Sequence, residues 1–276
     1  MNIYYLNHLN ERLELDSDNI ILQYQELFDY SWDVETENNK ISSFSRETAT
    51  IPITVTVTAD TEEEYVDILH NFHSAIEKDI VSCTPGRLYI GDQYLTCYIS
   101  GDIKQDAFMG VPIQVKNLTV VTDEPFWVSV SMFSFETEGI SSSKNKRYPG
   151  AYPYRYANGL NSTYILNPHF TDANFLLTIY GPVTNPLVVI GGNSYLVNIV
   201  LESGERLEID SRTETITKVM AFGEKVNAFH NREKGKTFFR RIPPGRQSVS
   251  WTGKFGWDLT IYEERSEPKW SGWRHH

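Results

Sequence analysis

The sequence is typical of a mainly β protein of two domains, with a single long helix in the first domain. In its last third, Gly, Pro and Asn clusters recur at intervals of roughly 8–12 residues between β-branched runs, the spacing of an antiparallel sandwich or barrel. One stretch in the first half alternates strictly between apolar and polar residues, and one stretch has helical spacing. At 276 residues the chain is long enough for two domains with separate cores.

The first domain, expected over residues 1–135 as a β-sandwich with one packed helix, begins with short β-prone segments separated by Asn and Asp. The aromatic residues 28–32 could begin a further strand, and the polar residues 35–40 are expected to form a loop. The β-prone segments are residues 3–9, 13–15 and 20–24.

Residues 51–58 form the clearest predicted strand. Apolar residues alternate with Pro and Thr, so a period of two places Ile51, Ile53, Val55 and Val57 on one face of a half-buried strand.

A long helix is expected over residues 61–79. Thr61 or Asp60 can cap it, Glu64 follows Thr61 by three residues as in a capping box, and acidic residues fill the first turn, where the helix dipole favours them. Its apolar residues fall in one stripe, which we expect to pack across the sheet of the first domain: Tyr65, Leu69, Phe72 and Ile76.

Further strands are expected on both sides of the domain boundary. In the first domain Gly91-Asp92 is a candidate hairpin turn and Gly101-Asp102 a candidate break, between strands at residues 87–90, 94–99 and 112–121. In the second domain, expected over residues 160–276 as an antiparallel sandwich, turn residues separate the apolar runs 187–190, 195–201 and 206–209.

Residues 136–159 are expected to link the domains, since Gly, Ser, Asn, Pro and Tyr are frequent there and no periodicity is evident. The Lys, Arg and Tyr residues of this region could contact a nucleic acid, a polysaccharide or another protein. An aromatic linker packed on both domains explains the same composition.

The net charge of −11 is unevenly distributed. Residues 1–135 carry 7 Lys and Arg against 22 Asp and Glu, whereas residues 136–276 carry 18 against 14. The acidic first domain argues against specific nucleic-acid binding, because a phosphate-binding surface must be cationic. A solubilising acidic surface is the simplest interpretation.

No catalytic, cofactor-binding or metal-binding residue is expected. His70 and His73 are three residues apart on the predicted helix, but no Cys or His follows at a ligand spacing. Carboxylate pairs such as Glu205 and Glu208 arise by chance in a chain with 36 Asp and Glu, and the sequence shows no nucleophile elbow. We therefore expect a protein that is not an enzyme.

The cysteines and the apolar segments indicate where in the cell the chain is made. Cys83 and Cys97 are expected to be two reduced thiols rather than a disulfide. No apolar run of about 18 residues occurs, and the first residues do not resemble a signal peptide, so neither a membrane span nor secretion is expected.

An ordered set of motifs resembles one known family. Asn185-Pro186 precedes a β run, a Ser-Gly-Glu hairpin leads to Ile209-Asp210, an Ile-Pro-Pro-Gly turn follows, and Arg265-x-Glu-Pro-x-Trp270 lies near the end. Pro85-Gly86-Arg87-Leu88 after the helix and Asp123-Glu-Pro-Phe-Trp127 resemble the end of that family's first domain. Over about residues 1–270 the chain resembles the distal tail (Dit) proteins of long-tailed phages and prophages of Gram-positive hosts.

The resemblance implies a structural role at the virion tail tip, after assembly in the cytoplasm of the bacterial host. The first domain is then expected to close into a homo-hexameric ring on the tail tube, and the second to be a galectin-like sandwich at its periphery. The ring would be a baseplate hub that joins the major tail protein of the tube to a tail-associated lysin or fibre protein and to receptor-binding proteins. Because a ring that passes DNA gains from a repelling wall, the acidic first domain acquires a second interpretation.

A carbohydrate-binding module for host cell-wall glycan is the alternative function. Five aromatic residues that could stack on sugar rings are concentrated in the last 26 residues: Trp251, Trp257, Tyr262, Trp270 and Trp273. Packing in the core or between domains explains the same residues. A third class, a tail lysin, needs an acid pair or a Cys–His dyad.

Overall fold

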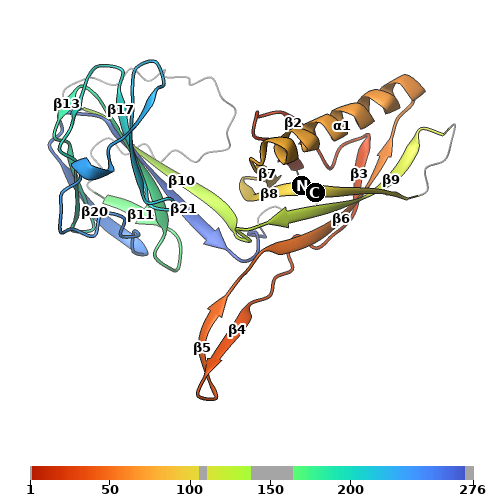
Figure 1. Ribbon diagram of the computed structural model, residues 1–276, viewed down its shortest axis with the longest axis horizontal. Helices are drawn as coiled ribbons and strands as arrows, with labels where there is room; N and C mark the ends of the chain where they lie inside the picture. Colours follow the sequence, from red (N-terminus) through yellow and green to blue (C-terminus); the bar gives the residue numbers. More distant parts are fainter. Residues whose placement is uncertain (1, 106–110, 138–163, 271–276) are drawn as a thin grey trace. The chain divides into compact units, whose positions relative to one another are not determined.

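The computed structural model describes residues 2–105, 111–137 and 164–270 (Figure 1). By packing, the chain forms two units, of which the first consists of Met1–Ser129 and Glu264–His276 and the second of Val130–Glu263. The predicted class, mainly β with two domains and one α-helix among the described residues, is confirmed. The expected linker lies, from residue 138 onward, outside the described residues.

The first unit contains two antiparallel sheets that share strand β8. One sheet has the order β10-β8-β7-β1-β2, and the other has the order β8-β9-β6-β3, while β4 and β5 pair with each other as a separate hairpin. The elements are β1 (Ile3–Leu6), β2 (Arg12–Glu14), β3 (Ile20–Gln25), β4 (Asp33–Glu37), β5 (Lys40–Ser45), β6 (Ala49–Thr58), α1 (Glu62–Ser82), β7 (Gly86–Ile90), β8 (Gln93–Gln105), β9 (Ile113–Thr122) and β10 (Trp127–Phe135), which belongs to the second unit from Val130 onward.

Strand β8 joins the sheets because its two halves have different partners. Its first half pairs with β7 across the predicted Gly91-Asp92 turn, and its second half pairs with β9. The predicted break at Gly101-Asp102 is wrong, since the register only shifts between Ile99 and Gly101 and the strand continues to Gln105. A β-bulge of this kind bends a strand without ending it, which lets β8 pass from one sheet to the other.

The alternating segment forms β6, and its apolar face is buried as predicted. Ile53, Val55 and Val57 are at most 1% exposed, and Ile51 packs against the same core. β6 pairs with β3 on one side and with β9 on the other, so it is an inner strand of its sheet.

Helix α1 begins where predicted but extends further. Thr61 Oγ1 accepts a hydrogen bond from the backbone N–H of Glu64 at 3.2 Å, and Phe72, at the centre of the predicted stripe, is fully buried. The helix ends at Ser82 rather than at residue 79, because Cys83 has the left-handed conformation that commonly ends a helix. In Figure 1 the helix lies along the strands of the first unit, and it contacts β2, β6 and β8.

A buried hydrogen-bond network fixes the last turns of α1 to β1. The carboxylate of Asp79, which is completely buried, accepts from the hydroxyl of Tyr5 at 2.5 Å and from the backbone N–H of His8 at 2.9 Å. Burial and this hydrogen bond raise the pKa of the Tyr5 phenol far above its usual value. Gly86 lies so close to the network that a Cβ there would overlap the phenol and the carboxylate.

A partly buried ion pair connects the two long strands and contacts the helix. Lys116 of β9 is 1% exposed, and its Nζ lies 2.7 Å from the Asp102 carboxylate of β8 and 4.8 Å from the ring centroid of Phe72. A buried ammonium needs such partners, because removal from water is costly without them.

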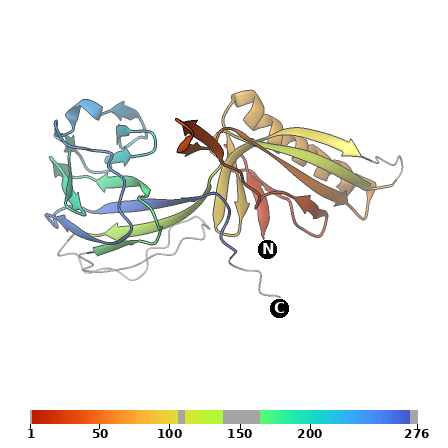
Figure 2. The ribbon, with the colours of Figure 1, turned by 90° about the horizontal axis from the view of Figure 1, so that it is seen from below.

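The second unit is an antiparallel sandwich. Its larger sheet has the order β19-β18-β17-β12-β21-β10 and its smaller sheet the order β11-β20-β14-β15; β10 and β21 lie side by side in Figures 1 and 2. The strands after β10 are β11 (Tyr164–Asn167), β12 (Asn174–Tyr180), β13 (Val183–Thr184), β14 (Leu187–Ile190), β15 (Asn193–Leu196), β16 (Val200–Leu201), β17 (Arg206–Asp210), β18 (Thr215–Val219), β19 (Lys225–Asn227), β20 (Gly245–Trp251) and β21 (Trp257–Arg265). The short 3-10 helix η1 (Phe229–Asn231) follows β19.

Alternate residues of both sheets form the core of this unit. Phe175, Leu177 and Ile179 of β12 are completely buried and belong to one cluster with Val188 and Tyr195 of the smaller sheet. The predicted run 195–201 is not one strand: β15 ends at Leu196, and the backbone N–H of Asn198 turns to the carbonyl of Asn231 at 2.7 Å.

Candidate assembly surface

The described parts of the chain contain no group of three or more His, Cys, Asp or Glu placed to hold a metal ion. His70 and His73 are exposed on α1, where His73 pairs with Glu77 at 2.9 Å. Cys83 is exposed and Cys97 is buried, and both are free thiols as expected. Within the same residues, no helix is long and apolar enough to cross a membrane.

The two carboxylates considered as a pair have separate partners. Glu205 lies 2.6 Å from Lys218, whereas Glu208 lies 2.7 Å from Arg206. The backbone N–H of Glu202 and the ammonium of Lys218 hold the pKa of Glu205 below its usual value, so this carboxylate stays charged.

Most of the C-terminal aromatic residues are buried or packed on other side chains. Trp257 is completely buried and stacks on Phe135 at 4.1 Å between ring centroids, and Trp251 packs edge-on against Trp257. Trp270 belongs to the first unit and packs on Phe28, with 4.4 Å between the ring centroids. Trp273 lies outside the described residues. Core packing therefore accounts for Trp251 and Trp257, which do not form a sugar platform.

The most prominent exposed feature of the first unit is the hairpin of β4 and β5, residues 33–45, here called the arm. Figure 1 shows it extending away from the rest of that unit. The predicted loop at residues 35–40 is wrong, because Asn38 and Asn39 adopt φ angles of 51° and 60° and form a tight two-residue turn between the strands. Asn tolerates this left-handed conformation better than other residues except Gly.

The arm has one apolar face and one polar face. Val34 lies opposite Phe44, and Thr36 lies opposite Ile41, so these side chains share a face. Val34, Ile41 and Phe44 are 51%, 61% and 57% exposed. An isolated two-stranded hairpin is only marginally stable in water, and a monomer gains little from a fully exposed apolar face. The arm is therefore suited to pack against another surface.

A cluster of aromatic residues around Arg46 forms the base of the arm. The guanidinium carbon of Arg46 lies 5.2–5.9 Å from the ring centroids of Tyr30, Trp32 and Phe126. Its Nη1 atom is buried without a hydrogen-bond partner among the described residues, and desolvation lowers the pKa of the guanidinium from its usual value. This cluster connects the two ends of the arm to the loop before β10.

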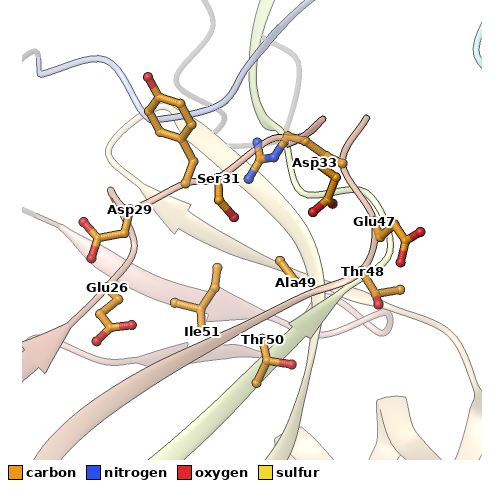
Figure 3. A pocket seen from close by; sticks show the side chains of 11 residues that line it. Glu26, Asp29, Ser31, Asp33, Glu47, Thr48, Ala49, Thr50 and Ile51 are labelled. Carbon is orange, nitrogen blue, oxygen red and sulfur yellow. The ribbon is translucent and has the colours of Figure 1, made fainter. Parts of the chain in front are cut away.

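A depression of about 420 Å³ lies beside this base. Figure 3 shows carboxylates of both flanking segments around it, and the acidic residues in its lining are Glu26, Asp29, Asp33 and Glu47. The Leu27 carbonyl within this region accepts a hydrogen bond from the indole N–H of Trp127 at 3.1 Å, which fixes the region to the core. The arm thus rises from an ordered, acidic surface.

Comparisons with known proteins find similarity in structure and none in sequence. No family model and no curated protein matches the sequence. The Dit protein of phage SPP1, described as a hub of the adsorption apparatus of phages that infect Gram-positive bacteria, is similar with a TM-score of 0.58 at 10% identity, over 95% of this chain and 98% of that one. A chain of the phage p2 baseplate, activated with calcium or with strontium, is similar with TM-scores of 0.58 and 0.60 at 11% identity, over 97% of this chain and 99% of that one. The shared fold agrees with the resemblance found in the sequence.

Proposed function

We propose that this chain is a structural hub protein of a long-tailed phage or prophage tail tip, which forms a homo-hexameric ring and has no catalytic role. The likeness to the hub and baseplate proteins supports this proposal because it covers both chains almost from end to end. The observation that carries it is the arm, whose apolar side chains are exposed in the single chain and would be stabilised by packing on a neighbouring copy.

A ring closed by rotation needs two different complementary patches on each subunit. In this proposal the arm is one patch. The other lies on the first unit of the next copy, where further apolar side chains are exposed. Candidates are Ile103 and Ile113 on β8 and β9, which are 66% and 38% exposed, and Val81 near the end of α1, which is 80% exposed.

The ring is proposed to join the tail tube protein to a tail-associated lysin or fibre protein and to receptor-binding proteins. Its first domain carries 22 Asp and Glu against 7 Lys and Arg within residues 1–135. A lumen lined by these acids would repel the phosphates of passing DNA. Acidic side chains that all point to the outer rim of an assembled ring would contradict this part of the proposal.

Mixing the purified chain with preformed tail tubes tests the proposal. Electron microscopy should show tubes capped at one end by a ring, and a variant in which residues 34–44 are replaced by a short Gly-Ser turn should leave the ends bare. The variant should retain the unfolding temperature of the parent within a few degrees, since the arm contributes little to the core. Bare tubes at saturating concentration of the unaltered chain would refute the hub.

A further inference from the structure

The second unit carries a strongly basic segment that the hub function does not use. Residues 232–246, here called the basic strap, follow η1 and include the first two residues of β20. They contain six cationic side chains and a single acidic residue, Glu233. Five of the cations are exposed, and the sixth, Arg232, is half-buried; the exposed ones are Lys234, Lys236, Arg240, Arg241 and Arg246.

The strap is ordered along the edge strand β15. The backbone N–H of Glu233 donates to the Leu196 carbonyl at 2.9 Å, and the hydroxyl of Tyr195 donates to the Arg240 carbonyl at 3.1 Å. Phe238, 3% exposed, anchors the middle of the strap in the core. Backbone held this firmly presents its cations in fixed positions, so that a partner pays less ordering entropy on binding.

The exposed cations are not neutralised within the protein. Lys234, Lys236, Arg240 and Arg241 form no ion pair with any residue that the structure describes. Glu233, the acid of the strap, accepts a hydrogen bond from the Ser194 hydroxyl at 3.3 Å. Although the whole chain has a net charge of −11, this concentration of positive charge attracts an anionic partner to the strap, because salt screens the more distant acidic residues.

The composition of the strap favours a phosphate polymer over a protein partner. Protein interfaces have apolar, aromatic centres and few lysines. The strap instead exposes Lys and Arg, and its large apolar residues are buried or half-buried: Phe238, Phe239 and Ile242. Arg supplies paired N–H groups that match phosphate oxygens, and Lys supplies a compact charge.

Two aromatic rings beside the strap each have a guanidinium of the strap packed on them. The guanidinium of Arg232 covers Phe229 at 3.7 Å from its ring centroid, and that of Arg246 covers Tyr164 at 3.7 Å. Proteins that bind single-stranded nucleic acid combine cations with open aromatic platforms. On the strap, the rings of Phe229 and Tyr164 already pack against a guanidinium, so cations rather than aromatic platforms dominate its surface.

We propose that the basic strap binds a linear phosphodiester polymer without nucleobases, of which poly(glycerol phosphate) is the simplest form. Binding is electrostatic, with successive phosphates paired to successive cations. The proposal goes beyond the hub function and does not depend on ring formation, since one copy carries the complete strap.

Fluorescence anisotropy with labelled poly(glycerol phosphate) tests this on the full chain. The double variant Lys234→Gln/Lys236→Gln should weaken binding at least about tenfold, and its affinity should fall less steeply with salt, the slope of log K against log salt changing by roughly 1.5 for two lost phosphate contacts. The matched control is Lys225→Gln/Lys254→Gln, which removes two exposed lysines of the same unit outside the strap. It should bind within about twofold of the parent.

Several outcomes would overturn the proposal. These are no binding by the parent at low salt, equal losses in the two double variants, or equal binding of uncharged dextran. A single-stranded DNA of the same charge that binds more tightly would show that the strap serves nucleic acid. Binding to an acidic protein but not to the polymer would show that it serves a protein interface. Unchanged unfolding temperatures in both variants ensure that lost binding reports lost charge.

Discussion

Polar substitution of the arm should prevent the proposed ring from forming without unfolding the subunit. Ile41→Ser and Phe44→Ser remove two side chains that are 61% and 57% exposed in the single chain. Burying a large apolar side chain completely contributes about 1.5–3 kcal/mol, so burying the exposed part of these two contributes about 2–3 kcal/mol to each interface. Since 1.4 kcal/mol corresponds to a tenfold change in a dissociation constant, the dissociation constant of each contact between copies should rise roughly 30- to 150-fold.

Sedimentation velocity over a range of protein concentrations measures this effect. The double variant should sediment as a monomer where the parent forms a ring, while the two unfold within a few degrees of each other, because the lost side chains are already in water. The control is Phe222→Ser/Val226→Ser in the second unit, whose side chains are 103% and 45% exposed. Identical distributions for the arm variant and the parent, or equal disruption by the control, would show that the arm does not form the contact between copies.

Three further predictions concern the subunit itself. Asp102→Ala should lower the free energy of unfolding by about 3 kcal/mol, because it leaves the ammonium of Lys116 buried without its partner. Lys116→Met should lower it far less, because no buried charge remains. Urea unfolding measures both variants, and equal losses of unfolding free energy would show that the ion pair does not have this role. Gly86→Ala should lower the thermal midpoint by several degrees and increase solvent exchange of the amides at the end of α1, and an unchanged midpoint would show that the close packing is absent. The lowered pKa of Glu205 stabilises the folded chain above the unfolded pKa of 4.5, and this stability is lost as the pH falls through the lower folded value. Glu205→Gln should therefore lower the midpoint at pH 7 and lower it less near pH 3, and a constant difference at both pH values would exclude the linkage.

The sequence predicted those elements whose pattern follows directly from burial. Residues 51–58 alternate because one face of β6 meets the core, and the stripe of α1 centres on Phe72 for the same reason. The Gly91-Asp92 turn was also recognisable, because Gly supplies the positive φ of 64° that a two-residue hairpin needs.

The predictions that the structure contradicts depend on contacts between residues far apart in the sequence, which a local sequence pattern does not contain. Residues 35–40 of the arm are predicted as a loop because they are polar, although Asn38-Asn39 between two β-prone segments is itself a hairpin signal. The attachment of the last turns of α1 to β1 depends on Asp79, a buried polar residue whose partner Tyr5 lies more than seventy positions earlier in the chain. The bulge after Ile99 depends on the change of partner strand along β8, which only the sheet arrangement determines.

The basic strap shows the same division between composition and placement. Its charge is evident in the sequence, but its order is not, since the hydrogen bonds that hold it come from β15, some forty residues earlier in the chain. Charge alone is compatible with a flexible tail; attachment to an edge strand makes it a defined surface.

Electron microscopy of the purified chain at high concentration is the most direct test of the hub. We expect closed rings with sixfold symmetry, in which the arm of each copy lies on the first unit of the next. Particles that remain single subunits at every concentration, with or without the tail tube protein, would contradict it.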